Sequence, residues 1–417
     1  MPPVNQPRHM VVIGAGIVGV CAALYLQRDG NRVTIIDPRQ PGEGASMGNA
    51  NVIAVESCVP VATPGILRRV PKMMLDPLSP LVVRWSYLPW LAPWLWQFAM
   101  ASRPAQVENI SIALASLLGQ VMADYRPLIE GAGVADMFHP TGMLAVFESE
   151  ARFAGYQLDL DLQQRRGVKA EVLSADQVRQ MEPALAPIFR HGVFYPDNWQ
   201  TTNSFRLVQA LAADLVRRGG AIVKSEARGF GFGPGGVHMV VTADGAVPCD
   251  GVVVAAGAWS KALAGALGES VMLDTERGYH VMLPNPGVSP RRPIYAADGG
   301  FVTTPLEDGL RFAGTVELGG LAAAPNYARA DVLLRQGRRM LPGLVETGRS
   351  DWMGFRPSLP DSVPVIGRAR RWGDAYLAFG HGHLGLTLAA TTGRIVADLA
   401  AGRDPGLDLR PFRPDRF

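Results

Sequence analysis

Hydrophobic positions near the start of the chain predict a strand, a helix and a second strand. Residues 10–13 form a short uninterrupted apolar run, which is the pattern of a buried parallel strand. Residues 21–28 continue as a helix with small side chains along one side, and residues 32–36 form a second apolar run. This order predicts a parallel βαβ unit, the building block of doubly wound α/β domains.

The later elements fall into two groups. Two buried strands, at residues 252–256 and 375–379, each lead into a turn of small residues, and a helix to residue 401 follows the second. Antiparallel strands are expected at residues 278–283, 294–304 and 310–315, single strands at 192–195 and 221–223, and a strand pair at 137–147 around Thr141-Gly142. Helical periodicity is found at residues 107–131, 150–166, 174–181, 203–218 and 327–340. The pattern predicts a parallel unit and a separate antiparallel block.

Three glycines after the first strand, Gly14, Gly16 and Gly19, fit the pattern G-x-G-x-x-G. The first allows a tight turn, the second lets the backbone approach a pyrophosphate, and the third lets helix and strand pack closely. Asp37 follows the second strand, where a carboxylate can accept hydrogen bonds from a ribose. The uncharged stretch 10–26 could also indicate a signal peptide or a membrane span. However, it is short, lacks a clean cleavage site, and is followed by a strand and an acidic residue at the spacing expected for a dinucleotide-binding unit. The motif predicts a dinucleotide site, with NAD and FAD both open at this point.

Composition and charge argue against several classes of protein. The chain has 417 residues, enough for two domains or for one domain with a large insertion, and its net charge of +3 without a long basic run gives no indication of nucleic-acid binding. Cys21, Cys58 and Cys249 are scattered, and the seven histidines show no H-E-x-x-H spacing. This argues against a disulfide framework, a zinc site or an iron–sulfur site, and it fits a reducing compartment. No metal is expected.

A tryptophan-rich insert (residues 77–104) differs in character from the rest of the chain. Its residues 81–100 are strongly apolar with only Arg84 charged, and Pro89 and Pro93 argue against one straight spanning helix. Tryptophan with leucine and a few basic residues suits a segment that dips into a membrane face, so we expect peripheral membrane contact. A buried helical hairpin or a subunit interface is the open alternative. The tryptophans and the other basic residues nearby are Trp85, Trp90, Trp94, Trp96, Arg68, Arg69 and Lys72.

Four blocks together resemble the D-amino-acid oxidase / glycine oxidase superfamily of flavoproteins. They are the N-terminal glycine motif, the loop Gly44-Ala-Ser-Met-Gly-Asn-Ala50, residues 253–260, and Arg356-Pro with Pro360-Asp361 followed by Gly380-His-Gly-His-Leu-Gly385. The spacing of the blocks covers nearly the whole chain. Gly278-Tyr279, the tryptophan-rich insert and the sequence Gly-His-Gly-x-Leu-Gly look most like the bacterial D-amino-acid dehydrogenase small subunit.

The resemblance implies a fold of class α/β, α+β in part, with a Rossmann-like domain that binds non-covalent FAD and a mixed antiparallel-sheet substrate domain. The FAD-binding domain is expected at residues 1–60, 200–265 and 350–417. The substrate domain is expected at residues 61–199 and 266–349, including the tryptophan-rich insert. No cysteine lies in the last third of the chain, so a covalent cysteinyl flavin is not expected.

The resemblance also implies which residues hold the cofactor. The glycine motif and Asp37 match the ADP site, the loop from Ser46 matches the flavin and diphosphate site, and Val223 matches the strand beside the adenine. The helix that follows the last glycine block would direct its positive end at the flavin, and His381 is a better candidate for a flavin contact than His383. The full set expected is Gly14, Gly16, Ile17, Gly19, Asp37, Ser46, Gly48, Asn49, Ala50, Val223, Ala256, Gly257, His381, Gly382, His383, Leu384 and Gly385.

Three further residues are implied to contact the substrate. Arg356 matches the arginine that binds the substrate carboxylate, for which a guanidinium offers two parallel donors; a structural salt bridge is the alternative. Tyr279 and His280 match the place where relatives supply a second contact to the carboxylate or amine, and Tyr279 ranks above His280, for which a histidine without a role is equally open. No second arginine lies around Thr303-Thr304, which weakens a glycine oxidase assignment.

The activity implied is oxidative deamination of a D-amino acid, small and neutral or proline-like, by hydride transfer from Cα to flavin N5. The imine then hydrolyses to a keto acid, and electrons pass to a quinone or another carrier. One alternative is a glycine- or sarcosine-type oxidase that uses oxygen. Another is an FAD-carrying subunit of a hetero-oligomeric dehydrogenase without activity of its own. The expected location is the cytoplasm, with contact to the inner face of the cytoplasmic membrane.

Overall fold

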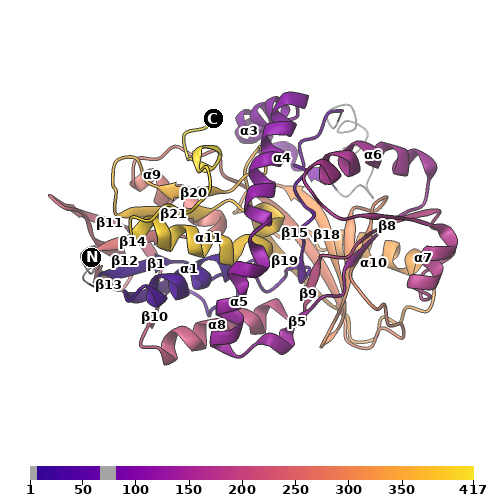
Figure 1. The fold of residues 1–417 in the computed structure, drawn as a ribbon, viewed down its shortest axis with the longest axis horizontal. Helices are drawn as coiled ribbons and strands as arrows, with labels where there is room; N and C mark the ends of the chain where they lie inside the picture. The colour runs from indigo at the N-terminus through magenta and orange to yellow at the C-terminus, as the bar shows by residue number, and fades with distance from the viewer. Residues whose placement is uncertain (1–6, 66–80) are drawn as a thin grey trace.

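The computed structural model describes residues 7–65 and 81–417 and contains two large sheets that lie side by side (Figure 1). The first sheet is parallel except for its last strand, which runs antiparallel to its neighbour. Its order is β10 (Ala221–Lys224), β2 (Arg32–Asp37), β1 (His9–Ile13), β14 (Gly251–Val254), β21 (Ala375–Phe379) and β20 (Val365–Arg368). The predicted βαβ unit is therefore present, and strands from distant parts of the chain extend it.

Helices cover one face of this sheet and a small antiparallel sheet covers the other. The helices α1 (Ile17–Arg28) and α11 (Gly385–Ala400) pack closely, since a Cβ atom on Gly393 would lie 2.8 Å from the Cys21 backbone. Three further helices complete this layer: α4 (Pro104–Leu118), α5 (Val121–Ala132) and α8 (Ser204–Arg217). The strands β11 (Ala227–Gly233), β12 (Gly236–Thr242) and β13 (Gly245–Pro248) form the opposite layer. The parallel sheet is thus buried on both faces, as its continuous apolar strands require.

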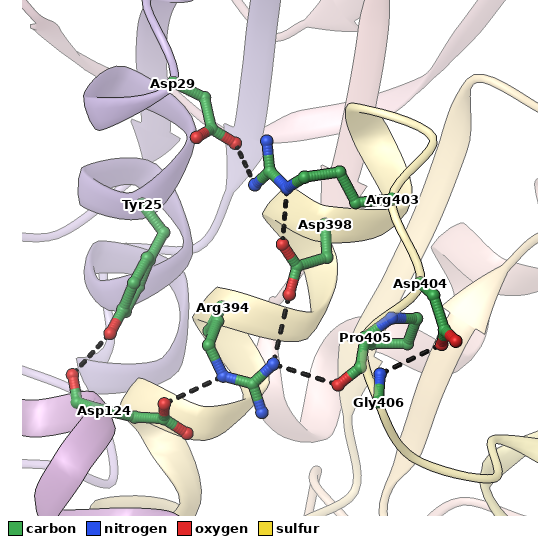
Figure 2. Close-up of polar contacts among 9 residues, drawn as sticks. All are labelled: Tyr25, Asp29, Asp124, Arg394, Asp398, Arg403, Asp404, Pro405 and Gly406. Atoms are coloured by element: carbon green, nitrogen blue, oxygen red, sulfur yellow. Dashed lines mark hydrogen bonds and ion pairs between the residues drawn. The ribbon is translucent and has the colours of Figure 1, made fainter.

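Ion pairs fasten the helical layer together (Figure 2). Arg394 of α11 donates from Nε to Asp124 of α5 at 2.8 Å and from a terminal nitrogen to Asp398 at 3.1 Å. Arg403, just beyond α11, binds Asp398 at 2.8 Å and Asp29 at the end of α1 at 2.6 Å. The network joins the two central helices, α1 and α11, to α5. The helical layer on this face of the first sheet is therefore stabilised by ion pairs as well as by packing.

The second sheet has nine strands of mixed direction. Most neighbours are antiparallel, while β16 with β6 and β18 with β4 are parallel. Its order is β19 (Ser350–Ser358), β15 (Asp274–Leu283), β18 (Gly309–Leu318), β17 (Phe301–Leu306), β16 (Ile294–Ala296), β6 (Met143–Phe147), β8 (His191–Tyr195) and β7 (Glu171–Ser174), with β4 (Leu81–Val83) beside β18. The mixed antiparallel sheet predicted for the second unit is confirmed.

The remaining elements lie beside one or the other of the two large sheets. A small sheet consists of β3 (Val52–Ile53), β9 (Trp199–Thr201) and β5 (Phe138–His139). The other helices are α3 (Leu88–Ala101), α6 (Glu150–Arg165), α7 (Ala175–Met181), α9 (Ser260–Ala266) and α10 (Ala328–Met340). Short 3-10 helices are η1 (Trp85–Tyr87), η2 (Ala135–Met137), η3 (Gly257–Trp259), η4 (Gly382–Leu384) and η5 (Arg410–Phe412).

The two strands expected on either side of Thr141-Gly142 are present, but the prediction that they pair with each other is wrong. Strand β5 pairs with β9 in the small sheet, whereas β6 pairs with β8 and β16 in the large one. All five residues of β6 are buried, so this strand needs a neighbour on each side inside a sheet. A local hairpin could supply only one of them.

Two expected domain boundaries also differ from the strand pairing and packing. Strand β19 begins the segment from residue 350 that we expected in the FAD-binding domain, yet it is hydrogen-bonded to β15 in the second sheet. The helices α4 and α5, expected in the substrate domain, pack their apolar faces against α1 and α11. The insert between β3 and β6 therefore returns to the first layer before it enters the second sheet.

The tryptophan-rich insert is described from residue 81 and forms β4, η1 and α3. Leu91 and Trp94 are buried against β4 and β18, whereas Trp85, Trp90 and Trp96 are 68%, 78% and 64% exposed. No helix in the described ranges combines the length and the apolar character needed to cross a membrane. The basic residues Arg68, Arg69 and Lys72 and the first four residues of the insert lie outside the described residues.

Candidate active site

The glycine turn after β1 touches the segment after β14. Gly14 has φ of +112°, and a Cβ atom on it would clash with the carbonyl oxygen of Ala255. A Cβ on Gly19 would lie 2.0 Å from the Gly14 carbonyl oxygen, so only glycine lets α1 approach the turn. Ala256 and Gly257, whose φ is +56°, continue along the same edge. The structure therefore brings the first and the third sequence blocks together at the carboxyl edge of the parallel strands.

Asp37 ends β2 and fixes the glycine turn. One carboxylate oxygen accepts a hydrogen bond from the Ala15 amide at 2.8 Å, and the other accepts one from the Arg39 amide at 2.8 Å. Each carboxylate oxygen has two acceptor positions, so both keep capacity for a ribose hydroxyl. Val223 lies on the neighbouring strand, in register with Ile36. The two predicted contacts to the adenosine half are thus side by side.

The loop from Ser46 to Ala50 reaches the start of α1. The Ser46 hydroxyl accepts a hydrogen bond from the Ile17 amide at 3.1 Å, which links the loop to the first turn of the helix. A Cβ on Gly16 would meet only the Ser46 hydroxyl, at 3.6 Å. The space in front of Gly16 is therefore open, as the approach of a pyrophosphate to the backbone requires.

The second sheet holds the far side of this loop. Arg311 of β18 donates to the carbonyl oxygens of Met47 at 3.1 Å and Asn49 at 2.8 Å, and Thr304 of β17 donates to that of Ala50 at 2.7 Å. Arg311 is buried, and this burial lowers its pKa to about 10. Sequence reasoning missed Arg311, although an arginine within an apolar strand was a visible anomaly. The loop is therefore one of the places at which the two sheets are joined.

His280 of β15 and Trp352 of β19 stack above the loop. Their ring centroids are 5.1 Å apart with planes 18° apart, and His280 Nδ1 lies 3.4 Å from the Gly48 carbonyl oxygen. A Cβ on Gly48 or on Gly354 would clash with the Trp352 ring. Burial, with a smaller contribution from the charge of Arg311, lowers the pKa of His280 to about 3, so its ring is neutral at physiological pH. Trp352 is a second site residue that sequence reasoning missed.

Arg356 lies across three strands on the same face as His280. A Cβ on Gly278 would lie 2.3 Å from the Arg356 guanidinium carbon, so the absent side chain of β15 makes room for the guanidinium. Arg356 donates to the carbonyl oxygens of Thr315 at 2.9 Å and Gly314 at 3.4 Å on β18. Thr315 has φ of +58°, where the strand is irregular. Burial lowers the pKa of Arg356, an electrostatic cost that an anionic ligand would offset.

Tyr279 does not share this face. Its side chain is 1% exposed, its hydroxyl donates to the Glu317 carboxylate, and it accepts a hydrogen bond from the Asn326 amide at 2.9 Å. Glu317 also pairs with Arg277, the neighbour of Tyr279 on the same face. Because side chains alternate along a strand, Tyr279 points away from Arg356 and His280. The geometry therefore favours His280 over Tyr279 as a residue of this face, the reverse of the expected order.

The two histidines of the last glycine block differ in their surroundings. His381 is buried, and its Nε2 lies 2.9 Å from the Thr392 hydroxyl in α11. His383 is exposed and lies close enough to Glu276 and Arg356 for both charges to act on it. The surroundings of His383, near Arg356, favour it as a residue that meets the substrate, while the flavin contact expected of His381 stays a prediction. The start of α11 has no side-chain cap, so its free amide groups remain available.

Comparisons with known proteins decide the family. The sequence matches the family "DAO: FAD dependent oxidoreductase" over residues 9–399. It is 42% identical to a D-amino-acid oxidase of Bradyrhizobium diazoefficiens and 31% identical to a D-amino acid dehydrogenase of Paramagnetospirillum magneticum, with 99% and 98% of both chains covered. The chain belongs to the DAO family. It is an FAD-dependent oxidoreductase.

Two solved structures share this fold. Glycine oxidase from Geobacillus kaustophilus superposes with a TM-score of 0.76 at 20% identity, covering 99% of this chain and all of that one. L-Proline dehydrogenase from P. horikoshii superposes with a TM-score of 0.72 at 19% identity, covering 99% and 98%. At these identities the likeness establishes the fold, and the chemistry must come from the site.

FAD is the cofactor of the DAO family, and the site of this chain fits it. The crowded Gly14 and Gly19 leave the open backbone at Gly16 facing the edge where a pyrophosphate would lie. The uncapped start of α11 lies at the other end of the same edge, following β21 in the sheet. The loop held by Arg311 runs between these two ends. An extended dinucleotide along this edge would meet each of the predicted blocks.

Proposed function

We propose that this DAO-family enzyme oxidises D-amino acids to imino acids, which hydrolyse to keto acids and ammonia. The observation that carries the proposal is Arg356, whose half-buried guanidinium lies over Gly278 on the face that holds the cofactor loop. An arginine in this position offers the two parallel donors that a carboxylate binds. The 42% identity with a D-amino-acid oxidase over 99% of both chains supports the choice of D-amino acids.

FAD, when bound, would supply the redox chemistry of the reaction, the acceptance of a hydride equivalent. The residues of the chain bind and orient the substrate. Arg356 binds its carboxylate, which fixes one end of the molecule beside the cofactor loop. His280 stays neutral, so it adds no charge that competes with Arg356, and the Trp352 ring stacked on it excludes water from that side. Orientation in a water-poor site is the main catalytic contribution expected of these side chains.

The substrate is proposed to be small and neutral or proline-like, because Trp352 occupies the space over Gly354 next to Arg356. The test is a dye-reduction screen of the purified holoenzyme with pairs of D- and L-amino acids and with N-methyl amino acids. Reduction by D-alanine or D-proline but not by the L-enantiomers is the expected result. Equal rates with both enantiomers would refute the proposal.

The carboxylate role of Arg356 is tested separately. Replacing Arg356 with alanine should raise the Michaelis constant strongly, because a buried carboxylate would lose both donors, while FAD stays bound. Gly229→Ala on β11 is the control variant, because an added Cβ there would contact no atom within 4 Å and should leave the Michaelis constant unchanged. An unchanged Michaelis constant in the arginine variant would reject the role.

We further propose that the electron acceptor is a quinone or another carrier and that the enzyme meets the inner membrane face through its tryptophan-rich insert. The exposed Trp90 and Trp96 lie on α3, and Tyr87 at the start of this segment donates to the Asp274 carboxylate of β15 at 2.9 Å. The insert is thus attached to the strand that bears Gly278.

Vesicle binding tests the membrane contact. Replacing Trp90 and Trp96 together with serine should abolish partition to vesicles without changing dye reduction, because both side chains are exposed. Trp94 is buried and is left intact. Unchanged partition would exclude this surface. The second candidate function is direct use of oxygen, because the 42% identical relative is named a D-amino-acid oxidase. Stoichiometric peroxide release without a dye would select it.

A further inference from the structure

Glu276 on β15 lies directly opposite Arg356 on β19, and neither the glycine blocks nor the family match assigns it a role. The two residues are cross-strand partners in an antiparallel pair, so their side chains leave the sheet on the same face. Arg356 turns along the sheet to the carbonyl oxygens of Gly314 and Thr315. A carboxylate therefore stands beside the seat proposed for the substrate carboxylate.

One oxygen of Glu276 is held in place. In the described part of the chain its carboxylate receives a hydrogen bond from the Ser358 hydroxyl, at 2.7 Å on Oε1. This contact orients the group and leaves Oε2 with its acceptor capacity. An α-amino acid has a positive ammonium one carbon away from its carboxylate. A fixed carboxylate next to a fixed guanidinium is the charge pattern that complements such a zwitterion.

His383 completes the group. It belongs to η4, which packs against β19, and the charged groups that act on it are Glu276 and Arg356. The helix that follows, α11, carries no titratable side chain before Arg394. The ordinary pKa of a histidine, about 6.5, lies below physiological pH, so the ring of the exposed His383 is mostly neutral there and can accept a proton.

We infer that Glu276 binds the ammonium group of the substrate and that His383 accepts a proton from it. This inference rests on the proposed function. One N–H bond of the ammonium breaks, the electron pair stays on nitrogen, and the proton goes to the free ring nitrogen of His383. The imidazolium that forms is stabilised by the Glu276 carboxylate. The neutral amine then has the electron pair that forms the C=N bond as hydride leaves Cα.

The Glu276 part is tested by ligand binding without turnover. The probes are 2-aminoisobutyrate, a zwitterion that has no Cα hydrogen and cannot be oxidised, and isobutyrate, which has the carboxylate alone. Each is titrated into the holoenzyme and followed by the change in the flavin spectrum. In Glu276→Gln the dissociation constant of 2-aminoisobutyrate should rise about 10- to 100-fold, the range for a hydrogen bond to a charged group. That of isobutyrate should stay the same.

Equal effects on both probes, or no effect on either, would overturn this role of Glu276. If wild-type holoenzyme binds both probes and is reduced by D-amino acids, such an outcome rejects this inference and leaves the proposed function intact. If the wild type is not reduced by any D-amino acid, the proposed function itself has failed.

The His383 part is tested by the pH dependence of flavin reduction in anaerobic stopped flow. At neutral pH, His383→Gln should be slower by about 100-fold, the lower range for general base catalysis. As the pH rises through the pKa of the substrate amine, the substrate arrives deprotonated and the variant should approach the wild-type rate. A defect of the same size at every pH would show that His383 only shapes the site and would reject the proton transfer.

Discussion

Replacing Gly278 with alanine tests how closely Arg356 is placed. The new Cβ would lie 2.3 Å from the guanidinium carbon, whereas carbon atoms in contact are about 3.5–4.0 Å apart. The guanidinium must therefore move by more than about 1 Å, a misplacement that can cost about 100-fold in rate. The displaced atoms are the end of a flexible side chain, so the fold should tolerate the change. The expected variant is folded and yellow but binds amino acids weakly.

The assay combines three measurements on the same preparation. Thermal unfolding and flavin content should remain near the wild-type values, while kcat/KM for D-alanine should fall about 100-fold. Gly229→Ala is the matched control, because Gly229 also lies in a strand and a Cβ on it would meet no atom within 4 Å. If Gly278→Ala kept the wild-type kcat/KM, the position assigned to Arg356 would be wrong.

Three further changes address other parts of the structure. Gly19→Ala should yield protein without flavin absorbance, because its Cβ would lie 2.0 Å from the backbone oxygen of Gly14; normal flavin content would contradict this packing. Glu317→Gln should lower the unfolding free energy by about 3–5 kcal/mol in denaturant titrations, because it leaves the fully buried Arg277 without its carboxylate; a loss below about 1 kcal/mol would argue against it. The pKa of His381 is about 3 in the fold because of burial, against about 6.5 unfolded, so the stability it contributes is present above pH 6.5 and is lost as the pH falls toward 3. His381→Asn should flatten the fall of Tm with acid in that window, and a parallel curve would refute the assignment.

Local sequence patterns predicted the parallel unit well because its strands are buried on both faces. Continuous apolar runs predict buried strands, and glycine motifs such as that at Gly14 predict tight turns, each from only a few neighbouring residues. The cofactor edge could be predicted for the same reason, since each of its blocks is a local turn after a strand.

The substrate face was harder to predict because it is made by pairing between distant strands. Nothing near Tyr279 in the sequence says which side of β15 it faces; the answer depends on the register with β18 and β19. Glu276 and Trp352 became visible as site residues only when that register placed them beside Arg356 and His280. Likewise, the sequence of β19 alone does not show that it pairs with β15, because that pairing joins segments about 75 residues apart.

The strand order of the first sheet has a consequence for the synthesis of the protein. Strand β1 leaves the ribosome first, but its neighbour β14 pairs in turn with β21, which begins at Ala375. At about 5–20 residues per second, α1 waits on the order of tens of seconds after its own synthesis for its partner α11, and β14 waits several seconds for β21. During that interval the apolar face of α1 has neither α11 nor the completed sheet to cover it. The cofactor edge is therefore complete only after β21 and α11, which lie near the end of the chain, have been synthesised.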